Sequence, residues 1–320
     1  MSPFWKKFLR EGHGLFARRT EPQLWLGAFG KHPGWDDHID DIGLETESLL
    51  LAKQIIYVDG IGGQINSGEW EKLNPTQRLP GFEHVFLWKR DEAFLLGGIW
   101  SSRDGKNRTQ YPLIICAHCM SVPLDWAVTS VLPTLCSIQA ECKSARRADE
   151  VREILRQALG YLRHLVENLD NLSLPGGLKM QEFTQRLGLQ EDQEALYQVA
   201  YFVQTQLAPY LKAARAPGEP LGSGHVRLPA IVGLVPETLT FWSLFLEFQL
   251  GTNVPVLLTL PLQEPWVDAT CGEPTCREFY SLRAAPEVLE LANAVECQIP
   301  PKFRKRHREL VQTVMEVIRG

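Results

Sequence analysis

The chain has 320 residues, of which 44% are hydrophobic and 22% are charged; these ordinary values exclude a disordered chain, a collagen and a simple coiled coil. Its 33 basic and 38 acidic residues give a formal net charge of −5, unlike a protein that binds nucleic acid over its whole surface. The longest apolar stretches, such as Val254–Leu262, fall well short of the roughly 18 residues of a membrane-spanning helix.

The first residues, Met1–Thr20, are basic and lack the apolar core and cleavage site of a signal peptide. We expect residues 1–23 to form an arm that docks on the core. A weak anchor at a membrane surface is the alternative, but two turns of helix bury too little apolar area to bind lipid firmly. Without an export signal, we expect a cytoplasmic protein whose seven cysteines are reduced thiols.

The first predicted strand is followed by a polar loop, a helix and a glycine-rich loop. Weak alternation predicts a strand at Gln23–Phe29, followed by the polar loop Gly30–Asp41. Gly43–Val58 is predicted to be helical, and the four glycines of Asp59–Gly68 predict a loop after it.

The clearest β signal comes from the apolar runs His84–Lys89 and Ala93–Trp100, which a short polar turn separates. A polar loop, Ser101–Gln110, leads to a third apolar run, Tyr111–Val122. These three runs predict a three-stranded antiparallel meander with one long loop.

The third run contains Cys116 and Cys119, whose spacing raises the possibility of a zinc site. Residues three apart in a strand point to opposite faces, so these two thiols are not expected to share a metal ion. We therefore interpret the cysteines as buried structural thiols and expect no cofactor.

The middle of the chain is predicted to be helical. Apolar residues recur every 3.6 positions from Val151 to Leu169 and again from Leu196 to Leu211. Asp149 is the expected N-cap of the first helix.

The last third mixes strands and helices after the proline- and glycine-rich segment Ala216–Gly224. Val254–Leu262 predicts a buried strand and Arg277–Leu282 a short one, whereas Pro286–Val295 and Lys302–Ile318 are expected to be helices. The succession of elements predicts an α+β fold, or a mixed α/β fold.

The loop Gly30–Asp41 holds a dense group of imidazole and carboxylate side chains. Imidazole and carboxylate together can bind a divalent metal ion that activates water, so a metal-dependent hydrolase is one hypothesis. Its candidate ligands are His32, Asp36, Asp37 and His38. Consecutive acids in a loop more often stay solvated or cap a helix, and no second cluster supplies further ligands.

Two segments together resemble the TagF/ImpM family, the accessory proteins of bacterial type VI secretion systems. Gly27–Asp37, GAFGKHPGWDD, is similar to the family's Gly-Lys-x-Pro loop and the Gly-Asp-Phe or similar sequence that follows it. The family usually has an aromatic residue after the loop aspartate, whereas here Asp37 and His38 follow Asp36. Ser101–Leu113, SSRDGKNRTQYPL, is similar to the family's Pro-Ser-x-Asp-x-x-Gly-Arg signature and the Phe-Pro-Leu after it. In this chain Ser101 replaces the first proline. The matching positions are Gly30, Lys31, Pro33, Asp36, Asp37, Ser102, Asp104, Arg108 and Pro112.

The resemblance implies an antiparallel sheet flanked by helices and a regulatory role without catalysis. Family members act in the cytoplasm, where they repress assembly of the secretion system by binding its components, including a forkhead-associated protein. It implies protein partners, and we expect neither nucleic-acid binding nor stable insertion into a membrane. It covers residues 24–122; residues 123–228 are then a helical insertion or subdomain, and residues 229–320 an α/β region that completes the core.

Both motif loops leave strand ends, so we expect them to lie side by side. Asp36 or Asp37 would then accept hydrogen bonds from Arg108 in a buried, charge-assisted pair that orders both loops. Lys31 would cap this arrangement or reach a partner. Whether the loops bind a partner or only stabilise the fold stays open at this point.

Overall fold

The computed structural model describes residues 21–90, 93–169, 178–189, 193–212, 222–295 and 297–319. Residues 1–20, which make up most of the expected N-terminal arm, lie outside the described residues. Within the described part of the chain, no helix has both the length and the apolar character needed to cross a membrane.

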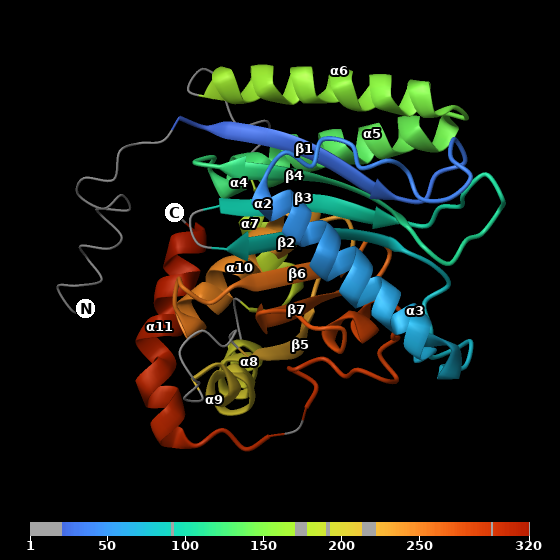
Figure 1. The fold of residues 1–320 in the computed structure, drawn as a ribbon. Coiled ribbons are helices and arrows are strands. Elements are labelled where there is room, and N and C mark those ends of the chain that lie inside the picture. The colour runs from blue at the N-terminus through green and yellow to red at the C-terminus, as the bar shows by residue number, and fades with distance from the viewer. Residues whose placement is uncertain are drawn as a thin grey trace.

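The described residues fold around a seven-stranded sheet in which all neighbouring strands are antiparallel (Figure 1). The strand order is β1-β4-β3-β2-β6-β7-β5. The strands are β1 Gln23–Gly30, β2 Glu83–Arg90, β3 Ala93–Trp100, β4 Leu113–Met120, β5 Ser223–Pro229, β6 Val256–Pro261 and β7 Trp266–Gly272. The α+β prediction is confirmed, as is the meander, which is formed by β2, β3 and β4.

The register of the first strands brings the two motif loops to the same end of the sheet. Strand β1 pairs along the outer side of β4, with Gly30 opposite Leu113. Strand β3 pairs along the other side of β4, with Trp100 also opposite Leu113. The loop after Gly30 and the loop after Trp100 therefore start beside each other, because both strands end at the same level.

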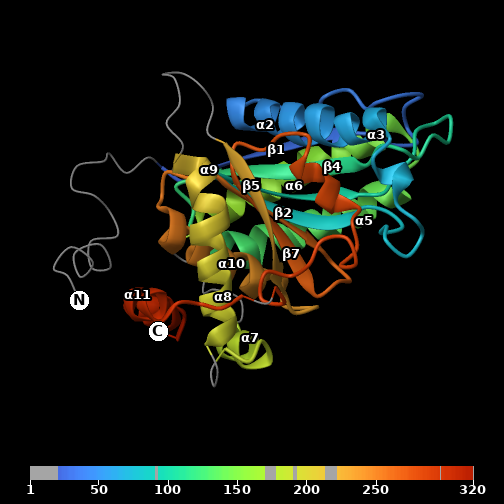
Figure 2. The same ribbon diagram turned by 90° about the horizontal axis from the view of Figure 1, so that it is seen from below.

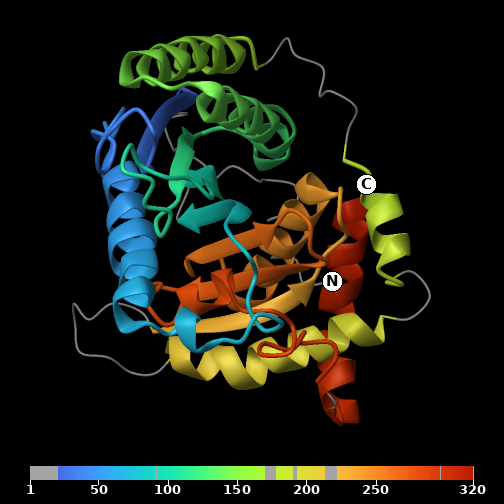
Figure 3. The same ribbon diagram turned by 90° about the vertical axis from the view of Figure 1, so that its right-hand side faces the viewer.

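Helices cover both faces of the sheet. On one face lie α2 Glu47–Ala52, the π-helix Lys53–Gly62 and α3 Gly63–Ser67, which form one continuous helical segment. The other face carries α4 Leu124–Trp126, α5 Leu132–Ser144, α6 Ala148–Glu167, α7 Met180–Arg186, α8 Glu194–Phe202, α9 Ala208–Lys212, α10 Val235–Leu250 and α11 Pro301–Arg319. Figure 3 shows the sheet between the blue segment Glu47–Ser67 and the red helix α11.

Residues of the sheet alternate between two hydrophobic cores. Leu87 and Cys119 pack in the larger core with α5, α6, α8 and α10. Phe86 and Cys116 pack in the smaller core with the segment Glu47–Ser67. The two cysteines thus face opposite sides of the sheet, as predicted, and burial raises the pKa of the Cys116 thiol to about 12.

The predicted helices of the middle region are confirmed. α6 spans Ala148–Glu167, and α8 continues through the π-helix Val203–Leu207 into α9, as the yellow ribbon in Figure 2 shows. The N-cap of α6 is Arg147, and Asp149 lies inside the first turn, where it pairs with the Arg147 guanidinium. Helices from residues 123–228 and from residues 229–320 pack in the same large core, and the expected boundary at 228 falls inside β5.

The loop predicted at Asp59–Gly68 is wrong, because the helical segment continues to Ser67. Its glycines allow close packing. A Cβ atom on Gly60 would lie 2.5 Å from the Phe279 ring, and one on Gly63 would lie 2.6 Å from Cys276 Sγ. Only Gly68 ends the helix, with a left-handed φ of 66°.

The strand and the helix predicted near the C-terminus are not formed. Hydrogen bonds to the buried Arg227 occupy backbone groups in both segments. Glu278–Leu282 is a 3-10 helix instead of a strand, and residues 286–295 form turns instead of a helix. The Arg227 guanidinium donates hydrogen bonds to the carbonyls of Ser281, Ala284 and Leu289. Its backbone carbonyl accepts the amide of Ala292, so that amide is not available to a helix.

Strand β7 is absent from the sequence prediction because a charged residue interrupts its apolar pattern. That residue, Asp268, is buried and holds Arg227 through two hydrogen bonds of 2.8 Å. Burial opposes ionisation of Asp268, but hydrogen bonds from His225 and Arg227 outweigh it and lower the pKa of this carboxyl.

Burial also makes the stability of the fold depend on pH through His84 of β2. Burial lowers its pKa from 6.5 to about 4, and the nearby Asp268 carboxylate offsets only part of this effect. The unfolded chain therefore binds more protons than the folded chain between these values. We expect the free energy of unfolding to fall by on the order of 3 kcal/mol as the pH drops from about 6.5 to about 4.

Urea denaturation across this pH range measures the effect. His84→Gln should reduce the loss of stability on acidification, whereas His164→Gln, at an exposed position on α6, should leave it unchanged. Equal pH profiles for wild type and His84→Gln would contradict the prediction.

Candidate functional site

Lys31 is buried at the point where the first motif loop leaves β1. Its side chain is only 4% exposed, and its backbone amide donates to the Pro112 carbonyl across the sheet edge. The ammonium group lies 2.8 Å from Asp104 Oδ2 and 2.5 Å from Asp37 Oδ1. Lys31 therefore joins both loops, and the expectation that it reaches out to a partner is wrong.

Asp104 is the acceptor that organises the second loop. Its Oδ1 accepts the backbone amides of Lys106 and Arg108 at 3.0 Å each, and its Oδ2 accepts Arg108 Nε at 2.6 Å. Burial opposes ionisation of this carboxyl, but the hydrogen bonds from Lys31 and Arg108 outweigh it. They hold the pKa of Asp104 well below its usual range.

Arg108 completes the connection between the loops. Its Nη2 lies 2.9 Å from Asp37 Oδ1 and 3.0 Å from the Asp36 carbonyl. The predicted contact is confirmed, with Asp37 pairing through its side chain and Asp36 through its backbone. The pair is not buried as predicted, since Asp37 is 63% and Arg108 48% exposed. The buried ion pair is instead the one between Lys31 and Asp104.

Local backbone geometry explains why the two loops fit together. Gly30 has a φ of 119°, and a Cβ atom there would lie 2.2 Å from the Pro112 carbonyl oxygen. Asn107 adopts a left-handed φ of 63° inside the turn that Asp104 caps. The Gly105 amide donates to the Trp35 carbonyl at 2.6 Å, which adds a direct backbone link between the loops.

His32 attaches the first loop to helix α5. Its Nε2 donates to the Cys142 carbonyl at 2.8 Å, and its Nδ1 accepts the Gly34 amide at 3.0 Å. Burial lowers the pKa of this imidazole. Both ring nitrogens are thus engaged in hydrogen bonds, and Pro33 beside it is half-buried.

His38, at the end of the loop, packs against two aromatic rings. Its Nδ1 is hydrogen-bonded to the Tyr57 hydroxyl at 2.8 Å, and its ring meets the edge of Tyr111. Burial, followed by the charge of Lys31, lowers the pKa of His38.

The candidate metal ligands do not converge. The described residues contain no group of three or more His, Cys, Asp or Glu side chains that could hold a metal ion. His32 faces α5, whereas Asp37 lies between two cationic groups, Lys31 and Arg108. The geometry therefore offers no support for the hydrolase hypothesis.

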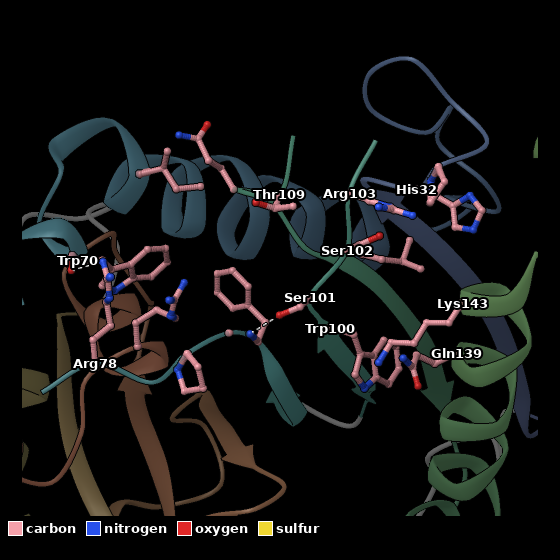
Figure 4. A pocket seen from close by; sticks show the side chains of 18 of the residues that line it. His32, Trp70, Arg78, Trp100, Ser101, Ser102, Arg103, Thr109, Gln139 and Lys143 are labelled. Atoms are coloured by element: carbon pink, nitrogen blue, oxygen red, sulfur yellow. Dashed lines mark hydrogen bonds between the residues drawn. The ribbon is translucent and has the colours of Figure 1, made fainter. Parts of the chain in front are cut away.

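A groove of about 670 Å³ opens beside the two loops, and the sequence analysis did not identify it (Figure 4). Its wall includes His32 and Pro33 from the first loop and Ser101, Ser102 and Arg103 from the second. Ser101 Oγ accepts the Phe82 amide at 2.7 Å, which fixes the start of the second loop against the groove. The sequence does not mark this groove as one site, because its walls come from five separate parts of the chain, within residues 32–33, 65–82, 100–113 and 139–146 and at residue 283.

Comparison of the sequence with protein-family models gives no match, and comparison with curated proteins gives none either. The resemblance to the TagF/ImpM family thus stays a prediction.

Replacing the two carboxylates of the network should lower the melting temperature by unequal amounts. Asp104→Asn removes the buried charge that balances Lys31, so we expect it to lower the melting temperature by roughly 5 °C or more. Asp37→Asn changes an exposed partner of the same lysine and should lower it by about 2 °C at most.

Thermal unfolding followed by circular dichroism measures both changes. The double variant Lys31→Met/Asp104→Asn removes both buried charges and should be more stable than Asp104→Asn alone. Equal melting temperatures for the two single variants would contradict the central place of Asp104.

Proposed function

We propose that this chain is a cytoplasmic, non-enzymatic adaptor or regulator that acts by binding proteins of a type VI secretion-like system. The observation that carries the proposal is the connection of Lys31, Asp37, Asp104 and Arg108 into one bonded network. Lys31, Asp104 and Arg108 are charged positions on which the TagF/ImpM resemblance rests, and Asp37 directly follows Asp36, the position that matches the family's loop aspartate. The two loops lie some 70 residues apart in sequence. A chance match would give no reason for them to meet.

The chemistry of the network favours binding over catalysis. A general base needs an accessible lone pair and a pKa near the working pH. Asp104 is buried and held ionised by its donors, and both nitrogens of His32 are already hydrogen-bonded. The groups that would perform proton transfer thus serve to hold the loops in place.

The exposed side of the network suits a protein partner. Asp37 and Arg108 are about half exposed, and the buried Lys31–Asp104 pair beneath them holds their positions. A partner that contacts this surface meets charges that are already ordered, so binding requires little further loss of side-chain entropy.

Affinity purification from the native host tests the proposal. We expect tagged wild type to recover secretion-system components, among them a forkhead-associated protein, in stoichiometric amounts. Arg108→Gln should reduce that recovery at least about tenfold, because it removes the bonds to Asp37 and Asp104.

The matched control is Arg156→Gln, which changes an exposed arginine on α6 whose ion pair among the described residues is with Glu153 of the same helix. It should recover the same partners as wild type. Circular dichroism establishes that both variants are folded. Recovery of the protein alone, with a tightly bound divalent metal, would overturn the proposal in favour of the hydrolase.

A further inference from the structure

The groove beside the motif loops carries a positive charge that contrasts with the acidic chain around it. Among the described residues that line it, the acidic side chain is Glu71, against five cationic ones. The cationic residues are Arg78, Arg103, Lys143, Arg146 and Arg283. The whole chain has a net charge of −5, so this local excess is opposite in sign to the rest of the protein. A cleft lined by one sign of charge concentrates ligands of the opposite sign.

Two of these arginines are fixed side by side at one end of the groove. Arg283 Nε donates to the Leu79 carbonyl at 2.8 Å, and its guanidinium lies 5.2 Å from the centre of the Phe82 ring. Arg78 Nη1 donates to the Trp70 carbonyl at 3.2 Å. A short β-bridge between Arg78 and Ala284 holds the two segments together.

Neither arginine forms an ion pair with a carboxylate within the described residues. Burial, followed by repulsion from Arg78, lowers the pKa of Arg283. The two guanidiniums repel each other, and the nearby Glu71 carboxylate offsets only part of this at Arg283, whose pKa stays lowered. An oxyanion between the two arginines would relieve the repulsion through paired hydrogen bonds.

Gln139 of α5 supplies an independent sign of a ligand at the other end. Its side chain lines the groove and is 92% buried, yet its Nε2 has no hydrogen-bond partner among the described residues. A buried amide donor without an acceptor is costly, and a ligand oxygen would satisfy it. Figure 4 shows Gln139 and Lys143 across the groove from Arg78 and Trp70.

We infer that this groove binds an extended acidic segment of a protein partner, with one carboxylate or phosphate between Arg78 and Arg283 and a second acceptor at Gln139. The donors at two separate ends call for a ligand that carries acceptors at intervals, as a peptide does. Trp70, Phe82 and Trp100, each only 2% exposed, form the packed floor of the groove and hold its walls in place.

The other anionic candidates fit less well. A nucleic acid would meet the negative charge of the whole chain beyond the groove. A small inorganic anion would fill only one end of a volume of about 670 Å³. The inference rests on the proposed function, because residues of both motif loops form one wall of the groove.

Fluorescence anisotropy with the full chain and labelled short peptides tests the inference. The probes are a Glu-Ser repeat, a Gln-Ser repeat of the same length, and the Glu-Ser repeat with one phosphothreonine. We expect the first and third to bind at least about tenfold more tightly than the neutral peptide, and more weakly as salt rises. The third probe distinguishes a phosphate from a carboxylate as the preferred group.

Two groove variants and one control complete the experiment. Arg78→Gln and Arg103→Glu should each weaken binding of the Glu-Ser peptide about tenfold, and Arg78→Lys less. Arg103 is exposed, and no side-chain bond is described for it, so its replacement should not disturb folding. Arg156→Gln should bind as wild type does.

Several results would overturn the inference. These are equal binding of the acidic and neutral peptides, wild-type binding by both groove variants, displacement of the peptide by equimolar inorganic phosphate, or tighter binding of a short single-stranded DNA. Partner recovery in the affinity purification separates the two proposals. If groove variants keep the partners and Arg108→Gln loses them, the groove inference fails while the adaptor function stands.

Discussion

A lysine ammonium buried against an aspartate carboxylate sets the arrangement of one end of this molecule. The Lys31–Asp104 pair removes two charges from water, so each depends on the other for compensation. Asp104 uses its remaining acceptor positions to shape the turn up to Arg108, and Lys31 holds Asp37. Two loops that would be mobile on their own therefore have one joint conformation. The surface that they present, and the groove wall that they form, depend on this pair.

A second buried ion pair fixes chain segments in one conformation at the opposite edge of the sheet. Arg227 and Asp268 join neighbouring strands β5 and β7, and the spare donors of Arg227 hold the carbonyls of Ser281, Ala284 and Leu289. The 3-10 helix Glu278–Leu282 and the turns that follow it are thereby fixed against the sheet. One consequence is the position of Arg283 at the groove, because the segment that carries it is held on both sides.

The sequence predicts what depends on local pattern and misses what depends on distant contacts. The β2–β3 hairpin follows from two apolar runs around a polar turn, and α6 follows from 3.6-residue spacing. The contact between Arg108 and Asp37 follows from two motif loops that both leave strand ends. The sequence pattern predicts a loop at Gly60. The structure shows a helix there, in which the absence of a side chain makes room for the Phe279 ring. The groove could not be foreseen, since Arg78 and Arg283 meet only after the sheet has assembled.

The junction between β2 and β6 has a consequence for how the chain is made. His84–Lys89 pairs with Val256–Pro261, so the first four strands are complete long before their neighbour has been synthesised. Until then, β2 is an open sheet edge whose amides and carbonyls can pair with any extended chain. The many helical residues between the two strands must be accommodated before that edge closes. The vulnerable period of this protein is therefore its synthesis, when contact with another nascent chain competes with its own sixth strand.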